Sequence, residues 1–219
     1  QPNILVKPTP TSSACWYPPC FALRCGLPRA LGPSNAARSQ SQVNTYMQFG
    51  NPKVFAIECH HEPIRNSTQR VFGRMCIRAG ERVLGNIDEP ACMLNVTEGF
   101  FVDLLPAIQN LENRELSEMP DVEAFKLLDN AVYLDDDRSS EQLASDAAKY
   151  SKFDFLTNGG ESFDGTKSFI HRVGDVIRIL FTDESDRFHS IHVEREEFEK
   201  VITQFLCWLE KEGQTVPAP

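Results

Sequence analysis

The clearest pattern near the start of the chain is an alternation of hydrophobic and polar positions. From Val54 to His60, the apolar residues Phe55, Ile57 and Cys59 occupy every second position. A period of two gathers such residues on one face of a strand, because successive side chains of a strand point to opposite sides. The pattern therefore predicts a half-buried strand.

The next patterned segment is expected to belong to a hairpin. Residues Arg70 to Arg78 carry apolar side chains on one face, with Arg74 and Arg78 on the other. The Ala79-Gly80 pair then reverses the chain into residues 82–85. A short turn between two such segments predicts a β-hairpin and hence antiparallel order.

The middle of the chain changes to a helical period. Asn95 or Thr97 is expected to cap a first helix, which Pro106 would interrupt or kink. Pro120-Asp121 opens a second helix, and the capping box at residues 139–142 opens a short third. In the first helix the apolar positions Phe101, Leu104, Leu105, Ile108 and Leu111 fall at helical spacing on one side. The expected buried stripe of the second helix is Val122, Phe125, Leu128 and Val132, and the third helix carries Leu143, Ala147 and Tyr150.

Strands are predicted again after the helices, at Lys167 to His171, Val176 to Thr182 and Phe188 to Val193. A final helix, Glu196 to Lys211, is expected to end at Gly213. Its apolar face comprises Phe198, Val201, Ile202, Phe205, Trp208 and Leu209. Strands and helices grouped in separate runs indicate an α+β fold, with a mostly antiparallel sheet packed with about four helices.

The first 46 residues differ in composition from the rest of the chain. Prolines mixed with Ser, Asn and Gln interrupt every helical or strand pattern there, so a disordered or irregular extension is expected. Its longest apolar run is too short for a secretory signal, and the prolines oppose the amphipathic helix of a transit peptide. We expect three units, namely the extension 1–46, an α+β domain 47–212 and a tail 213–219. Met47 is the first methionine, and a simple interpretation is that the native product starts there.

Charge narrows the kind of partner that the domain would suit. The first 46 residues hold four of the 22 basic residues and no acidic residue, which leaves 18 basic against 31 acidic residues and a formal charge of −13 for residues 47–219. This excess disfavours nucleic acid and anionic membranes and suits a basic protein partner. No stretch approaches the roughly 20 apolar residues of a membrane span, so a soluble protein is expected. Cys59, Cys76, Cys92 and Cys207 lie in apolar contexts typical of buried free thiols, which indicates a reducing, cytoplasmic location.

The search for catalytic or metal-binding patterns selects no site. His60 and His61 could meet His189 or His192, but within each pair the side chains point to opposite faces of a strand, so we predict no metal. The loop 160–167 resembles a phosphate-binding loop only with Lys and Thr reversed, and it leads into a strand instead of a helix. Surface carboxylates are abundant, and nothing singles out a catalytic pair. We predict neither an enzyme nor a cofactor.

Clusters of acidic residues are the remaining distinctive feature. Most such clusters are solvated loops or exposed helix faces. One of them could instead imitate an anionic substrate and dock into the basic cleft of a partner, where opposite potentials also speed association. One acidic cluster spans residues 194–199. The other two supply the candidate partner-binding residues, which are Asp135, Asp136, Asp137, Asp183, Glu184 and Asp186.

Five segments of the chain carry a family resemblance, namely residues 49–57, Phe72-Gly73-Arg74-Met75-Cys76, Gly85-Asn86-Ile87-Asp88, Val176-Ile177-Arg178-Ile179 and the helix from Phe198 to Leu209. Together they resemble the Immunity protein 42 family of bacterial polymorphic toxin systems. The resemblance spans nearly all of residues 47–212, and it rests on the order and spacing of the segments. It implies a small cytoplasmic α+β protein that neutralises a cognate toxin by direct binding, without catalysis or cofactor. It implies no particular contact residue, and the long extension departs from the family pattern.

The predicted function is therefore that of a bacterial immunity protein, which occludes the active site or substrate path of its toxin. One rival is a hydrolytic or metal-dependent enzyme that uses the histidines and surface carboxylates. Another is a general protein-interaction domain. A pocket joining His60 or His61 to His189 or His192 would favour the enzyme.

Overall fold

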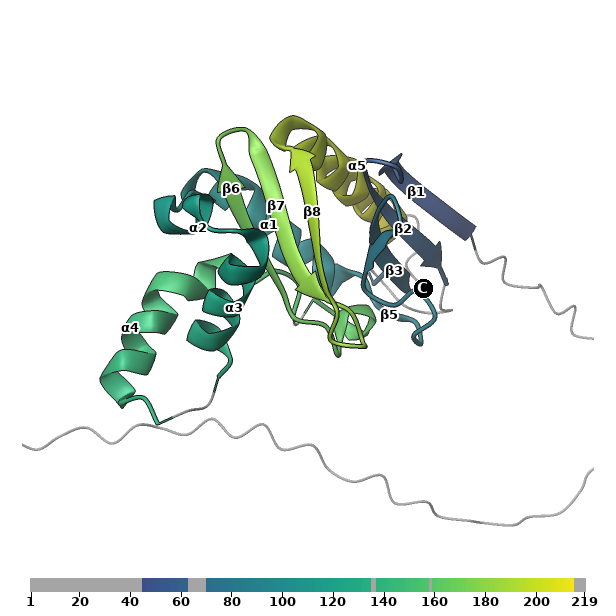
Figure 1. Ribbon diagram of the computed structural model, residues 1–219. Coiled ribbons are helices and arrows are strands. Elements are labelled where there is room, and N and C mark those ends of the chain that lie inside the picture. The colour runs from purple at the N-terminus through teal and green to yellow at the C-terminus, as the bar shows by residue number, and fades with distance from the viewer. Residues whose placement is uncertain (1–44, 63–69, 135–136, 158, 215–219) are drawn as a thin grey trace, which may run out of the picture. The chain divides into compact units, whose positions relative to one another are not determined.

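The computed structural model describes residues 45–62, 70–134, 137–157 and 159–214, and the strands of this part form two antiparallel sheets (Figure 1). In the first sheet the order is β1-β2-β3-β4, and β5 also pairs with β3. In the second the order is β6-β7-β8. The first sheet contains β1 (Thr45–Asn51), β2 (Phe55–His61), β3 (Phe72–Ala79), β4 (Arg82–Leu84) and β5 (Cys92–Met93). The second contains β6 (Ser168–Val173), β7 (Val176–Thr182) and β8 (Phe188–Glu194).

Five α-helices lie in the described part of the chain. In chain order, four of them follow the strands of the first sheet and precede those of the second. The longest, α5, contacts β1 and β2 of the first sheet and β7 and β8 of the second, so it packs against both sheets (Figure 1). The helix α3 packs against β7. The helices are α1 (Asn95–Ala107), α2 (Arg114–Glu118), α3 (Asp121–Val132), α4 (Ser140–Tyr150) and α5 (Arg195–Gln214), with short 3-10 turns at Ile108–Leu111, Ser151–Phe153 and Glu161–Phe163.

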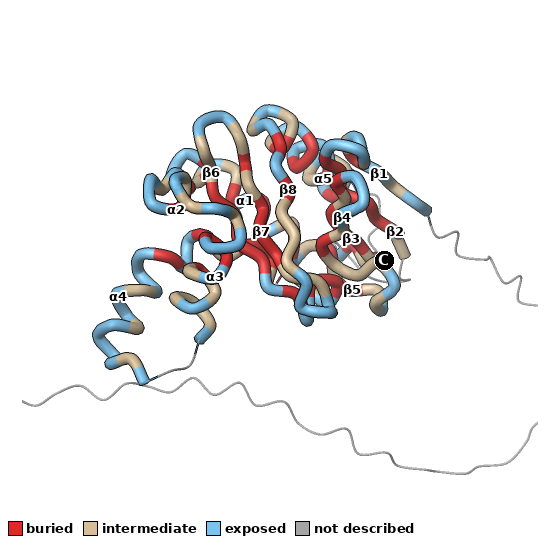
Figure 2. Tube along the Cα trace, in the orientation of Figure 1, coloured by how far each residue is buried: buried red, intermediate tan, exposed pale blue. Residues whose placement is uncertain are grey.

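Phenylalanine rings form the centre of the core, where α5 meets α1 and the first sheet. Phe198 of α5 lies 5.2 Å, ring to ring, from Phe55 of β2, and Phe205 of α5 lies 5.8 Å from Phe101 of α1. All four side chains are fully buried. Large aromatic rings contribute much of the apolar area that folding removes from water, so these contacts fix α5 in place. Buried residues accordingly follow the strands and the inner sides of α1 and α5 (Figure 2).

The predicted α+β fold with antiparallel strands is confirmed, but the strands divide between two sheets instead of one. The predicted hairpin is confirmed by the antiparallel pairing of β3 with β4. The expected half-buried character of β2 is wrong, because Ala56 and Glu58 on its second face are buried as well as Phe55 and Ile57. The strand β1 was not predicted, and it begins two residues before Met47. The predicted disordered extension falls almost wholly outside the described residues.

Three expectations about single residues are corrected. Val122 faces solvent at the start of α3, where Ala124 is buried instead. Cys207 is exposed on α5, because it lies off the buried stripe of that helix, whereas the other three thiols of the domain are buried as expected. Neither Asn95 nor Thr97 caps α1, whose N-cap residue is Leu94. The Asn95 side chain instead accepts a hydrogen bond from the amide of Val71.

Pro106 lies in the last turn of α1, which ends one residue later and continues as a 3-10 turn. The α-helix therefore includes the proline, and the change to a 3-10 turn comes after it. The final helix was predicted to end at Gly213, but α5 includes that glycine and ends at Gln214.

Candidate functional site

The structure separates the predicted acidic residues into different parts of the chain. Asp135 and Asp136 lie outside the described residues, and Asp137 is exposed in the segment between α3 and α4. Asp183, Glu184 and Asp186 lie together in the turn between β7 and β8. This turn therefore holds three of the six predicted residues.

The carboxylate of Asp183 organises the β7–β8 turn. Its Oδ1 atom accepts hydrogen bonds from the backbone amides of Ser185 at 2.9 Å and Arg187 at 3.1 Å. Its Oδ2 atom lies 2.9 Å from Nε of Arg187 and 2.9 Å from Nε2 of His189. The hydrogen bond with His189 lowers the pKa of Asp183, desolvation opposes this, and the two amides and the guanidinium of Arg187 strengthen it. Asp183 is therefore held as a carboxylate, with its oxygens directed at groups of its own turn.

Glu184 and Asp186 are exposed on the same turn. Oε1 of Glu184 accepts a hydrogen bond from Nδ2 of Asn86 at 2.8 Å, which ties the turn to the chain just after β4. Asp186 has a φ angle of 56°, a left-handed conformation that Asp tolerates better than most residues. Its amide donates to the carbonyl of Asp183 at 2.9 Å. The two outward carboxylates thus sit on a turn of defined shape.

Two shallow grooves flank this turn, and each contains a further carboxylate. Asp88, with Asp183 and Glu184, lines a groove of about 430 Å³. Asp164 and Asp186 line the other, of about 460 Å³, together with Asp129, whose carboxylate pairs with Lys167. We call Asp88, Asp164, Asp183, Glu184 and Asp186 the acidic turn surface. Asp88 and Asp164 were not predicted as site residues, because only the fold brings their loops beside the β7–β8 turn.

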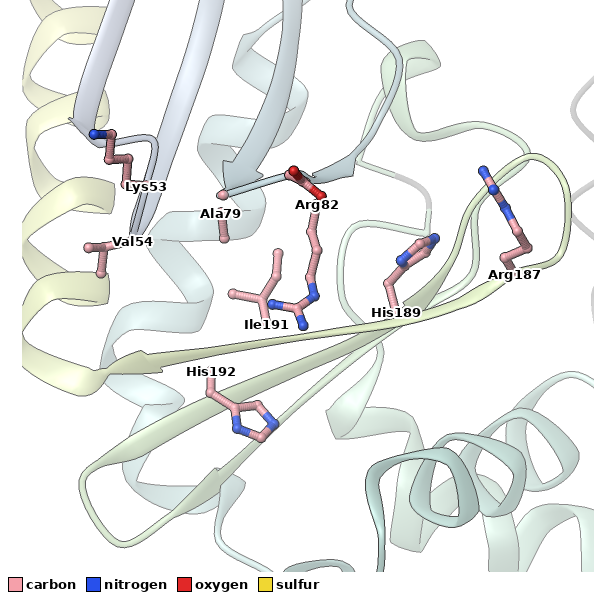
Figure 3. A pocket seen from close by; sticks show the side chains of 10 residues that line it. Lys53, Val54, Ala79, Arg82, Arg187, His189, Ile191 and His192 are labelled. Carbon is pink, nitrogen blue, oxygen red and sulfur yellow. The ribbon is translucent and has the colours of Figure 1, made fainter.

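A groove of about 750 Å³ lies between the first sheet and β8 (Figure 3). The turn between β1 and β2 and the β3–β4 hairpin form one side, and β8 forms the other. We call it the cationic groove, because its lining includes Lys53, Arg82 and Arg187 and only one acidic residue, Glu81. Arg187 also lines the groove that contains Asp88, so the cationic groove and the acidic turn surface adjoin. Sequence reasoning missed this groove entirely.

A third polar cluster lies between α3 and the second sheet. His171, Arg178 and His192 are paired neighbours across β6, β7 and β8, so they share one face. Asp121, at the start of α3, lies 2.6 Å from Nε2 of His192 and 3.2 Å from Nη1 of Arg178. His171 is fully buried, and burial, aided by the charge of Arg178, lowers its pKa to about 4.

The histidines considered as metal ligands are engaged in separate contacts. His189 and His192 point to opposite sides of β8, as predicted, with His189 facing the cationic groove (Figure 3). The ring of His60 packs on Tyr46 and the ring of His61 on Trp208. Across the residues that the structure describes, no three His, Cys, Asp or Glu side chains gather in a way that could hold a metal ion.

Comparison with known families identifies the kind of protein to which this surface belongs. The model of Immunity protein 42 matches residues 47–208. The chain belongs to the Immunity protein 42 family. This confirms the resemblance seen in the sequence, and it makes the chain a toxin immunity protein whose partner is a cognate toxin.

Other comparisons place this Immunity protein 42 family member among known folds. The crystal structure of CdiI from Burkholderia dolosa AUO158 is similar, with a TM-score of 0.53 and 17% sequence identity. The similarity covers 74% of this chain and 99% of that chain, and at this identity it shows a shared fold. A search of curated proteins finds no match for this family member. Within its described residues, the helices are too short or too polar to cross a membrane.

Proposed function

We propose that this immunity protein neutralises its toxin by covering the active site or substrate path with the acidic turn surface. The observation that carries the proposal is the internal bonding of Asp183, which fixes the turn while Glu184 and Asp186 face outward. A turn held in its binding conformation loses little conformational entropy on association, so more of the contact energy appears as affinity.

The charge of the domain supports a basic cleft as the target of this surface. Carboxylates on a rigid turn match the charge of an anionic substrate, and opposite potentials raise the rate of association and fix the orientation of docking. The formal charge of −13 over residues 47–219 also attracts a basic partner at longer range. It also disfavours nucleic acid and anionic membrane surfaces as partners. The protein acts in the cytoplasm, by binding alone, without catalysis or a cofactor.

The test compares two charge-reversal variants of the full chain in binding to the cognate toxin domain. Glu184→Lys combined with Asp186→Lys changes the acidic turn surface. Asp103→Lys combined with Glu210→Lys makes the same change in net charge on exposed positions of α1 and α5. We expect the first pair to raise the Kd by about tenfold or more, since like charges at an interface are strongly unfavourable. The second pair should change the Kd much less.

Growth rescue gives an independent measurement of the same proposal. Co-expression of the toxin with the unaltered chain or the control pair should restore growth, and co-expression with the turn pair should not. Equal affinity for both pairs would show that the toxin binds elsewhere on the protein. Failure of the unaltered chain to bind or rescue would contradict the choice of toxin and the mode of inhibition together.

A further inference from the structure

The side chain of Arg82 differs from those of the other described arginines in having no hydrogen-bond or ion-pair partner among the described residues. The others each have an interaction partner, for example Glu58 for Arg78 at 3.0 Å and Asp183 for Arg187 at 2.8 Å. Arg82 is exposed on β4, and its side chain extends across the cationic groove toward β8, where Ile191 and His189 lie (Figure 3). In a domain with a large excess of acidic residues, an unpaired guanidinium directed into a groove indicates an anionic group from another molecule.

A second cation of the groove is free as well. The ammonium group of Lys53, on the turn between β1 and β2, has no ion pair with any described residue. Arg187 adds positive charge at the other end of the groove, although Asp183 partly neutralises it. Glu81 is the one carboxylate among the groove's residues. The groove is therefore a region of positive potential on a protein that is otherwise strongly acidic.

The remaining residues of the groove give it an apolar component. Ile191 of β8 and Ala79 at the end of β3 are both buried, and the side chain of Val54 is exposed at the rim. Free guanidinium and ammonium groups beside apolar side chains suit a peptide segment in which acidic and apolar residues occur together. A small inorganic anion would use the cations alone.

We infer that the cationic groove receives an acidic segment of the cognate toxin, with Arg82 and Lys53 binding its carboxylates. This rests on the proposed function and adds a second contact of opposite sign. Because Arg187 belongs to the linings of both regions, one toxin domain would meet the acidic turn surface and the cationic groove together. A toxin with a basic cleft but no acidic segment beside it would bind poorly, so the paired charges select the cognate toxin.

The experiment measures toxin affinity for the full chain carrying Lys53→Glu and Arg82→Glu, singly and together. The matched control carries Lys126→Glu and Lys211→Glu, two exposed lysines on α3 and α5 that also have no ion pair with a described residue. We expect the double groove variant to raise the Kd by about tenfold or more and the control to leave it within about threefold. Circular dichroism and thermal unfolding check the fold of each variant, and all four side chains are exposed.

A charge exchange decides whether the contact is direct. Reversing acidic residues of the toxin segment to Lys should restore affinity toward the Lys53→Glu, Arg82→Glu variant and weaken it toward the unaltered chain. Equal toxin affinity of groove and control variants would overturn the inference and leave the proposed function standing. Binding of inorganic phosphate that depends on Arg82, with toxin affinity unchanged in the groove variants, would identify a small-anion site and overturn it as well. If the groove variants lose toxin affinity and the Glu184→Lys, Asp186→Lys pair does not, the acidic turn surface is not the binding site, whereas the contact at the cationic groove stands.

Discussion

His192 on β8 lies 2.6 Å from the carboxylate of Asp121 at the start of α3, and this contact joins the second sheet to the helix that covers it. Asp121 also accepts a hydrogen bond from Arg178 of the central strand β7. Desolvation raises the pKa of Asp121, but its hydrogen bonds with His192 and Ser190 and the charge of Arg178 outweigh it and leave the pKa lowered. A single carboxylate therefore holds two strands and one helix together.

The change Asp121→Ala should lower the free energy of unfolding by about 2–3 kcal/mol, because it leaves a partly buried guanidinium without its partner. Urea denaturation monitored by circular dichroism measures this. The control is Glu123→Ala in the same first turn of α3, whose side chain is exposed and should matter by no more than about 0.5 kcal/mol. Similar losses for the two variants would show that helix-terminal charge matters and the contact with the sheet does not.

His171 should make stability depend on pH in a defined window. Its pKa is lowered from 6.5 to about 4 by burial and the nearby charges of Arg178 and His192, with Asp121 opposing. Below pH 6.5 the unfolded chain binds a proton that the folded chain does not accept until about pH 4. Stability should therefore fall by about 3 kcal/mol as pH decreases through this interval, since one pKa unit corresponds to about 1.4 kcal/mol.

The variant His171→Leu should remove most of this slope. Neither ring nitrogen of His171 has a hydrogen-bond partner among the described residues, so leucine should also raise stability at pH 7 by about 1 kcal/mol. Urea denaturation at pH 4.5, 5.5, 6.5 and 7.5 gives both quantities. Carboxylates with lowered pKa values, such as Asp121, lose their contribution at lower pH, below about 4. An unchanged slope in His171→Leu would show that another group takes up the proton.

Gly50 should be intolerant of any side chain. Its φ angle is 89°, and a Cβ atom there would lie 2.5 Å from the carbonyl oxygen of Phe55 and 2.5 Å from a methyl carbon of Val201 on α5. Gly50→Ala should cost about 3 kcal/mol or more, because strain and a backbone clash add together. Gly174 has a φ angle of 59° and open space around it, so Gly174→Ala should cost only about 1 kcal/mol, and thermal unfolding distinguishes the two.

Short-range signals explain the parts of the fold that the sequence predicts well. The capping box of α4 is confirmed, because Ser139 and Gln142 form both of its reciprocal hydrogen bonds within four residues of chain. The strand β7 was predicted with its correct ends, since its apolar run is bounded by turn residues on both sides. Helix α3 was predicted at Asp121 on similarly local grounds, with Phe125 and Leu128 correctly buried.

Features that depend on distant residues were not predictable in this way. The strand β1 buries only Phe49, so its own pattern is weak, and it is held in place by pairing with β2. The cationic groove takes Lys53, Arg82 and His189 from segments that no local pattern connects. The acidic turn was visible as a run of charge, but the sequence did not show that Asp183 serves the turn itself and leaves Glu184 and Asp186 outward.

The position of α5 has a consequence for when protection begins. This helix follows all eight described strands in chain order, yet it contacts both sheets and supplies Phe198 and Phe205 to their shared core. A nascent chain emerging from the ribosome therefore presents two unfinished sheets until the helix arrives to close them. A newly translated copy therefore cannot bind its toxin until α5 has been synthesised and has packed onto both sheets, and during that time the cell depends on copies completed earlier.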